Sequence, residues 1–329
     1  MNELKILFLS IIISLPIIAK ASSMNIHSFN QDVNTIAGMY EYKLNENFAA
    51  LDTQINKWNN PEERDQDGLW KLLSTTHWGG CYGSHWQESL QFYQKWLKFN
   101  PESAGAATAE SRCWIDAAWA IRGGKYNPSD DPVAMNIFTP RIEKAEQILK
   151  DSKKFSASNP LWYLLYLDLA ISTKRDDKFI ESIFNEGITK FPSFQELYFL
   201  MTKHWAARSG EKANWQKVNE VINQAVTLTS NSDGISNYAR LYSWIAYRQS
   251  LELNIFQDGL ISWPKMRESY EDLVRRYPSP NNLNDFAVYA CRAGDKSTYL
   301  TIRAEIQEHV LSTRWPSNYS MDVCDHMFM

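Results

Sequence analysis

The sequence predicts an all-α protein, built as a right-handed stack of degenerate helical hairpins that forms an α-solenoid. Three observations support this prediction. First, apolar residues recur at positions i, i+4 and i+8, most clearly between Asp176 and Phe191. Second, proline stands where one amphipathic helix ends and another begins, as in Phe191-Pro192. Third, no run of residues alternates with a period of two for long enough to indicate a strand.

The chain opens with a segment typical of a secretory signal peptide. Lys5 supplies a positive charge, residues 6–18 are largely apolar, and Ala19-Lys20-Ala21 places small residues where a signal peptidase cleaves. We therefore expect residues 1–21 to be removed and the mature protein to be periplasmic or secreted. The apolar run is short for a membrane span and no cysteine follows it to accept a lipid, so we expect no stable membrane anchor.

After an N-terminal segment, residues 22–44, the pattern is helix after helix from residue 45 to residue 311. Proline and glycine between the amphipathic stretches delimit these helices. Residues 312–329 form a tail with Met321, Met327 and Phe328, which we expect to dock on the last hairpin. Helices are predicted over residues 45–58, 61–75, 84–99, 103–122, 132–153, 160–173, 176–191, 193–208, 212–229, 235–252, 264–277, 281–293 and 295–311.

The junctions between helices recur with a rough period. Pro160 and Pro192 are about 32 residues apart, close to the 34-residue unit of tetratricopeptide repeats. Gly187 and Ala225, inside the second helix of a hairpin, would let neighbouring helices approach closely. The proline junctions are Asn100-Pro101, Asn159-Pro160, Phe191-Pro192 and Tyr277-Pro278.

Two stretches carry a family pattern. The first contains Trp96-Leu97, Pro101-Glu102-Ser103, Trp114, Ala118-Trp119 and Arg122-Gly123-Gly124-Lys125-Tyr126. The second contains Tyr270-Glu271-Asp272-Leu273, Tyr277-Pro278-Ser279, Phe286-Ala287, Cys291 and Ala293-Gly294-Asp295. Together they resemble an uncharacterised bacterial family, a tetratricopeptide-like domain of unknown function, four-zero-three-four in that series. Where the family has a Trp-Gly-Gly element, this chain has residues 206–210, and the resemblance implies a helical-repeat fold without a known activity or catalytic residue.

Four cysteines, Cys81, Cys113, Cys291 and Cys324, lie in the part expected to be exported. An even number in an oxidising compartment indicates two disulfides, for which three connectivities exist. Proximity along the chain favours Cys81–Cys113 and Cys291–Cys324, each closing a loop about as long as one helical hairpin. The alternative is buried free thiols, which the apolar neighbours of Cys113 and Cys291 would accommodate.

Composition and charge narrow the classes of partner. A formal net charge of −4 gives no electrostatic reason to expect nucleic acid or anionic lipid as a partner. Aromatic residues make up 13% of the chain, which leaves the helices with large apolar faces to bury. The chain has no Gly-rich phosphate loop, nucleophile elbow or zinc motif, so we expect no cofactor and no bound metal.

The stretch from His77 to Trp86 is the densest in chemically capable side chains. His77, Cys81 and His85 could ligate a soft metal or form a Cys/His nucleophilic pair. Three glycines in the stretch argue against one helix that aligns these side chains, and a disulfide would remove the thiolate. A turn between two helices therefore explains the stretch better, and we retain His77 and His85 only as candidates for a binding loop.

Arg122-Gly123-Gly124-Lys125 places two cations around a glycine pair, which is typical of an anion-binding nest. Ordinary helix termination explains the same pattern, because glycine ends helices and cations suit the last turn. Loops that join repeat helices nevertheless line many binding surfaces. Arg122 and Lys125 therefore join His77 and His85 as the candidate binding loop.

The predicted stack indicates a binding function, because inner helices of such stacks present side chains to a peptide or protein. We expect an exported, non-catalytic protein-binding scaffold of the cell envelope that holds a protein partner in its concave face. One form would be an immunity or accessory protein that neutralises a toxin delivered to the same compartment. The alternative is an enzyme that processes envelope glycan or peptide, which would need a pair of acids converging in a groove.

Overall fold

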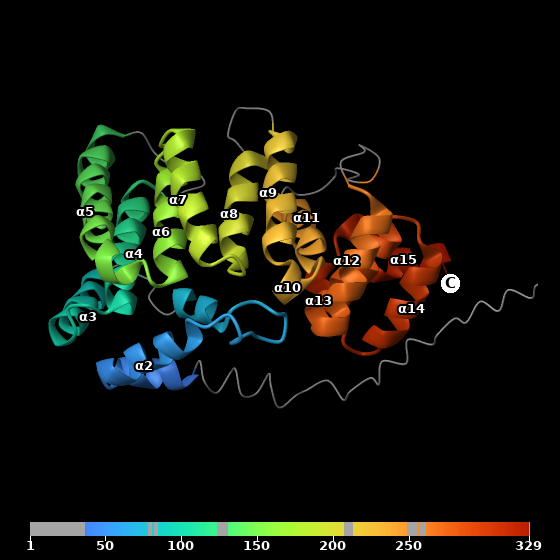
Figure 1. The fold of residues 1–329 in the computed structure, drawn as a ribbon, viewed down its shortest axis with the longest axis horizontal. Coiled ribbons are helices and arrows are strands. Elements are labelled where there is room, and N and C mark those ends of the chain that lie inside the picture. The colour runs from blue at the N-terminus through green and yellow to red at the C-terminus, as the bar shows by residue number, and fades with distance from the viewer. Residues whose placement is uncertain are drawn as a thin grey trace, which may run out of the picture.

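A computed structural model describes residues 37–77, 81, 85–123, 131–206, 213–248, 256 and 261–328 (Figure 1). Over these residues the fold is all-helical, with one isolated bridge between Arg64 and Trp70 and no strand. The all-α prediction is therefore confirmed. None of the described helices is both long enough and apolar enough to cross a membrane. The predicted signal peptide lies outside the described residues.

The helices form a row in which neighbours in sequence are neighbours in space (Figure 1). The elements are α2 (Phe48–Trp58), η1 (Lys71–His77), α3 (Trp86–Phe99), α4 (Ala104–Ile121), α5 (Pro132–Ser156), α6 (Pro160–Ser172), α7 (Asp177–Lys190), α8 (Gln195–Ala206), α9 (Trp215–Leu228), α10 (Ser230–Asp233), α11 (Ser236–Arg248), α12 (Trp263–Arg276), α13 (Pro280–Arg292), α14 (Lys296–Ile306), η2 (Ser312–Arg314), η3 (Ser317–Tyr319) and α15 (Met321–Phe328). Helices α4, α6, α8, α11 and α13 each pack against the long helix that follows them. Helix α4 also contacts α6, α6 contacts α8, and α8 contacts α11.

Polar side chains explain where several helices begin. Asn159 Oδ1 accepts a hydrogen bond from the backbone N–H of Leu161 at 2.9 Å, and Asp176 Oδ1 accepts one from Phe179 at 3.0 Å. These bonds satisfy N–H groups that have no partner in the first helical turn. Pro160 occupies the first position of α6, where no N–H is needed.

The core runs along the whole row and is rich in aromatic side chains. The Trp162 indole N–H donates to the carbonyl of Leu149 at 2.9 Å, which joins α6 to α5. The rings of Phe184 and Tyr198 meet edge to face at 5.7 Å, which joins α7 to α8. Packing between helices therefore explains the high aromatic content. The largest buried side chains include Trp96, Trp162, Tyr163, Tyr198, Tyr270 and Tyr299.

One predicted helix is wrong, because residues 61–75 are not helical throughout. Residues 61–70, which we call the strap, form a turn instead, and η1 follows it. Gly68 has a φ of +82°, and Asp65 Oδ1 accepts hydrogen bonds from two backbone N–H groups of the strap, each at 2.9 Å. Such local side-chain bonds compete with the hydrogen bonds of a helix.

The C-terminal region also differs from the prediction of one helix over residues 295–311. Helix α14 ends at Ile306, and Gln307 has a φ of +50°, a conformation that ends helices. The tail then folds into η2, η3 and α15. The ring of Phe328 in α15 lies 5.3 Å from that of Tyr299, so α15 contacts α14.

The two disulfides join Cys81 to Cys113 and Cys291 to Cys324, with Cα atoms 4.9 and 5.9 Å apart. These are the pairings that proximity along the chain favours, and the alternative of free thiols is wrong. The first disulfide ties the segment after η1 to α4, and the second ties α15 to α13. In the chain-entropy model each would contribute about 3–4 kcal/mol to stability.

Candidate functional site

Corresponding faces of successive helices line a common cavity. On α4 the lining residues are spaced i, i+3, i+4 and i+7, and the same spacing recurs on α6 and α8. This spacing belongs to one face of a helix, so the three helices turn equivalent faces to one space. The lining residues are Gly105, Thr108, Ala109 and Arg112 on α4, Leu161, Leu164, Leu165 and Asp168 on α6, and Glu196, Phe199, Leu200 and Lys203 on α8.

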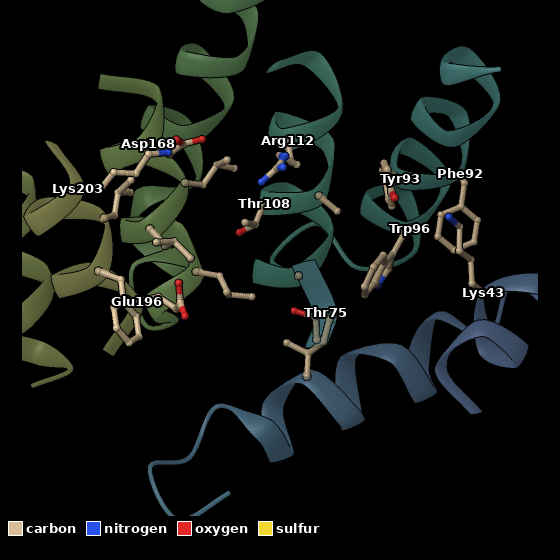
Figure 2. A pocket seen from close by; sticks show the side chains of 18 of the residues that line it. Lys43, Thr75, Phe92, Tyr93, Trp96, Thr108, Arg112, Asp168, Glu196 and Lys203 are labelled. Atoms are coloured by element: carbon tan, nitrogen blue, oxygen red, sulfur yellow. The ribbon is translucent and has the colours of Figure 1, made fainter. Parts of the chain in front are cut away.

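The space they enclose, the first cavity, has a volume of about 400 Å³ (Figure 2). Figure 2 shows Arg112, Asp168 and Lys203 along one edge of this cavity. Glu196 on α8 and Thr75 on η1 lie toward the opposite edge. The leucine and aromatic side chains between these edges make an apolar floor with polar borders.

Two polar atoms at the α3 end of the first cavity have no hydrogen-bond partner among the described residues. They are the hydroxyl of Tyr93 and the indole N–H of Trp96, and both side chains are buried. Burial, together with the nearby charge of Asp116, raises the pKa of Tyr93, so its hydroxyl stays protonated. Lys43 lies over the rings of Phe92 and Tyr93 at 5.7 and 5.8 Å, and burial lowers its pKa. The α3 end of the first cavity therefore combines aromatic rings with the hydroxyl of Tyr93 and the N–H of Trp96.

The same four lining positions recur on α13, and the first three of them recur on α11, where they border a second cavity of about 880 Å³. Because Glu196, Phe199 and Trp244 line both cavities, the two are adjacent, and we call them together the groove. The lining residues of the second cavity include Arg240, Ser243 and Trp244 on α11 and Asp285, Val288, Tyr289 and Arg292 on α13.

A polar network from three distant parts of the chain borders the second cavity. The side-chain amide of Asn281 donates to Asp67 Oδ2 at 2.8 Å, and Arg314 Nε donates to Asn281 Oδ1 at 3.1 Å. Arg314 Nη1 lies 3.3 Å from Asp285 Oδ2. Burial raises the pKa of Asp285 to about 6, although the Arg314 guanidinium acts in the opposite direction. Two carboxylates, Asp67 and Asp285, thus belong to one network at the cavity.

The strap forms part of the wall of the second cavity and is held there by Arg64 and Trp70. Arg64 Nη1 donates to Gln195 Oε1 at 2.9 Å, and Arg64 Nη2 lies 3.6 Å from Asp233 Oδ2. The indole N–H of Trp70 donates to the carbonyl of Ser193 at 2.8 Å. The two hydrogen bonds join residues 131 and 123 positions apart, so no local sequence pattern indicates them.

Among the ligands that the sequence offers for a metal or a nucleophilic pair, Cys81 is bonded to Cys113 and has no thiolate. His85 is exposed at the start of α3, and its Nδ1 lies 3.0 Å from Glu88 Oε1. His77 ends η1, and its side chain lies outside the described part of the structure. The described residues contain no group of three or more His, Cys, Asp or Glu side chains that could hold a metal ion.

The second half of the candidate binding loop lies at the end of α4. The Arg122 guanidinium packs over the rings of Trp119 and Phe138, at 5.6 and 5.0 Å. Gly123 has a φ of +84°, which suits the termination of a helix. Lys125 lies outside the described residues. Neither His85 nor Arg122 lines the groove, so the structure does not bring these two described residues of the candidate loop to it.

No family model matches the chain, and neither a curated protein nor a solved structure matches it. The resemblance to the tetratricopeptide-like family therefore stays a prediction. A function for this chain rests on the geometry and chemistry of the groove.

Proposed function

We propose that the chain is an exported, non-catalytic scaffold that holds an extended segment of a protein partner in the groove. The observation that carries this proposal is the recurrence of one lining face on α4, α6, α8, α11 and α13. An α-solenoid of tetratricopeptide-like hairpins would produce such a recurrence, because it turns the equivalent helix of each hairpin to its concave side.

The composition of the groove suits a peptide chain. Its middle positions are largely apolar, as at Leu164, Phe199 and Trp244, while Arg112 and Asp168 place opposite charges at the edge. Apolar area favours association, and charges of both signs fix the orientation of a bound segment. Two adjacent cavities also offer successive sites to successive residues of an extended segment.

The disulfides support the proposed location. Disulfides persist in oxidising compartments, so two of them agree with a periplasmic or secreted protein, as does the predicted signal peptide. One concrete form of the scaffold is an immunity or accessory protein that neutralises a toxin reaching the same compartment. Such a protein needs a binding surface and no catalytic set.

Chemical cross-linking of the tagged protein in envelope and culture fractions, followed by mass spectrometry, tests the proposal. We expect one near-stoichiometric protein partner, recovered about tenfold less with Leu164→Glu/Leu200→Glu, which charges the apolar floor of the first cavity. Leu228→Glu, at an exposed position on α9, is the matched control and should leave recovery unchanged. A partner that the groove variant retains, or no near-stoichiometric partner, contradicts the proposal.

One observation favours a second candidate function, an enzyme that processes envelope glycan or peptide. Acid–base hydrolysis uses two carboxyl groups, one protonated and one ionised. Asp67 and Asp285 both line the second cavity, and burial raises the pKa of Asp285 to about 6. In this reaction Asp285 would protonate the leaving group as its bond breaks, and Asp67 would accept a proton from the water that forms the new bond.

Product release from purified envelope glycan and from envelope peptides tests the second candidate. Wild-type protein should release products at a mildly acidic pH, and Asp285→Asn should abolish the release because an amide does not donate the proton of an acid. Asp151→Asn, at an exposed position on α5, is the matched control. Release that Asp285→Asn leaves unchanged would remove this candidate.

A further inference from the structure

We propose that the second cavity binds a neutral saccharide, at a site separate from the apolar floor of the first cavity. The second cavity has a volume of about 880 Å³, within the range of small-molecule sites. Three parts of the chain build it: the strap, helices α8 and α11–α13, and the tail around η2 and η3. The inference gives a ligand class to the cavity used by the second candidate function, but it rests on binding and not on hydrolysis.

The charges that line the second cavity balance one another. The lining contains three cations and three carboxylates. The cations are Arg240, Arg292 and Arg314, and the carboxylates are Asp67, Glu196 and Asp285. Arg314 lies 3.3 Å from Asp285, and Arg240 donates to the backbone carbonyl of Asp67. A strongly charged ligand would add an uncompensated charge to this balanced lining. The lining therefore favours a polar ligand without net charge.

Two buried polar atoms at this cavity have no hydrogen-bond partner among the described residues. Asp67 Oδ1 can accept a hydrogen bond, and Arg240 Nε can donate one. Both belong to residues that line the cavity. A hydroxyl group both donates and accepts, so a polyhydroxylated ligand suits a lining that offers donors and acceptors, whereas an apolar ligand would leave polar groups of the lining unpaired.

Aromatic rings complete the lining. Trp244 is half-buried and lines both cavities, and Trp315 of the tail lines the second cavity. The Trp315 indole N–H donates to Asn284 Oδ1 at 2.8 Å, which fixes the ring. The C–H groups of a sugar ring are attracted to the electron-rich face of an indole, while its hydroxyls point to the polar groups at the edge. Rings and planar polar groups that are already held in place reduce the entropic cost of binding.

Two exposed serines of the tail provide matched variants for a test. Ser317 lines the second cavity, and Ser312 lies in the same tail without lining it. Ser317→Trp should fill the cavity, whereas Ser312→Trp adds the same side chain elsewhere on the tail. Neither serine is part of the core, so both variants should keep the stability of the wild type.

The experiment measures binding of N,N′-diacetylchitobiose, a neutral disaccharide, by calorimetry and saturation-transfer NMR with the full chain and intact disulfides. We expect saturable binding by wild type and Ser312→Trp, and affinity lower by at least about tenfold for Ser317→Trp. The deacetylated, cationic disaccharide and digalacturonate, an anionic one, should bind more weakly than the neutral probe.

Three results would overturn the inference: no saturable binding by the wild type, equal binding by Ser317→Trp, or tighter binding of a charged disaccharide. None of them concerns the protein partner, whose recovery depends on Leu164 and Leu200 in the first cavity. A chain that binds the neutral disaccharide without a protein partner supports this inference and contradicts the scaffold proposal. Binding without cleavage likewise separates it from hydrolysis.

Discussion

Arg64 is the residue that connects the strap to the rest of the molecule. Its guanidinium donates to the carbonyl of Pro61 at 2.7 Å and to that of Gly68 at 3.1 Å, which fixes the turn itself. The same group reaches Gln195 on α8 and Asp233 on α10. Asp233 is buried, and Arg64 together with Arg240 compensates its negative charge.

Removing this cation should destabilise the protein. Arg64→Leu is expected to lower the free energy of unfolding by about 3 kcal/mol, because it removes the ion pair with the buried Asp233 carboxylate and leaves the interaction with Arg240. Arg64→Leu/Asp233→Asn should recover part of that loss. Lys95→Ala breaks an exposed ion pair with Glu46 and should cost less than about 1 kcal/mol. Urea unfolding measures all three, and equal losses for the Arg64 and Lys95 variants would refute the prediction.

Asp285 should be visible in the pH dependence of stability. Its pKa is about 6 in the folded protein, against about 3.9 for an exposed aspartate. Between these values the folded state binds more protons than the unfolded state, so this group makes stability fall as the pH rises from about 4 to 6. The free energy of unfolding of wild type minus that of Asp285→Asn should decline over this window, by on the order of 1–2 kcal/mol.

Urea unfolding of both proteins at several pH values between about 4 and 7 measures this difference. Carboxylates with lowered pKa values, such as Glu146 and Asp295, act in the opposite direction but contribute equally to both proteins. A difference that does not change with pH would show that Asp285 titrates normally.

The sequence predicts the ends of a helix well where signals within or next to that helix determine them. Helices α6 and α7 were expected within about one residue of their ends, because apolar spacing, Pro160 and the capping Asp176 are all local. The strap has a similar mixture of acids and apolar residues, but its conformation depends on Asp65 and on contacts with α8 and α13. A pattern within the strap cannot reveal those distant partners.

A concave binding face was expected, but its lining residues were not predicted, for a related reason. The groove is lined mostly by leucines, aromatic residues and scattered charges. Within any one helix, this pattern predicts a buried face that packs in the core. The lining positions i, i+3 and i+4 recur on α4, α6, α8, α11 and α13, and i+7 recurs on all of these except α11. Irregular insertions between the helices hide this recurrence in the sequence. The stretch from His77 to Trp86 has more chemically capable side chains, yet its cysteine forms a disulfide.

Helices α6, α7 and α8 approach closely at Gly187, so a larger side chain there tests how tightly they pack. A Cβ atom there would lie 2.9 Å from Leu197 Cδ1 and 3.2 Å from Tyr163 Cβ. Gly187→Val should therefore lower the free energy of unfolding by about 1–3 kcal/mol through overpacking, despite the low helix propensity of glycine. Thr189→Val, exposed on the same helix, should change it by less than about 0.5 kcal/mol. An equal or smaller loss for Gly187→Val would mean that the helices separate readily.

For the whole molecule, the two disulfides lie toward opposite ends of the row (Figure 1). One joins Cys81 to α4, and the other joins the tail to α13. Most contacts between them link helices that are close in sequence, whereas the strap reaches from the first part of the chain to Asn281. If contacts between neighbouring helices dominate, a local loss of structure should stay local. If the contacts of the strap dominate, the loss should spread along the row.

Removing the disulfide between Cys291 and Cys324 distinguishes these two possibilities. Cys291→Ala/Cys324→Ala frees a loop of about 33 residues and should lower the free energy of unfolding by about 3–4 kcal/mol in the chain-entropy model. If stability is a sum over neighbouring hairpins, amide protection should fall in α15 and α13 and persist in α6. Hydrogen exchange with mass spectrometry measures both regions. Equal loss of protection in α6 would mean that the strap couples the ends of the row into one cooperative unit, because helix-to-helix contacts alone would confine the change to the C-terminal end.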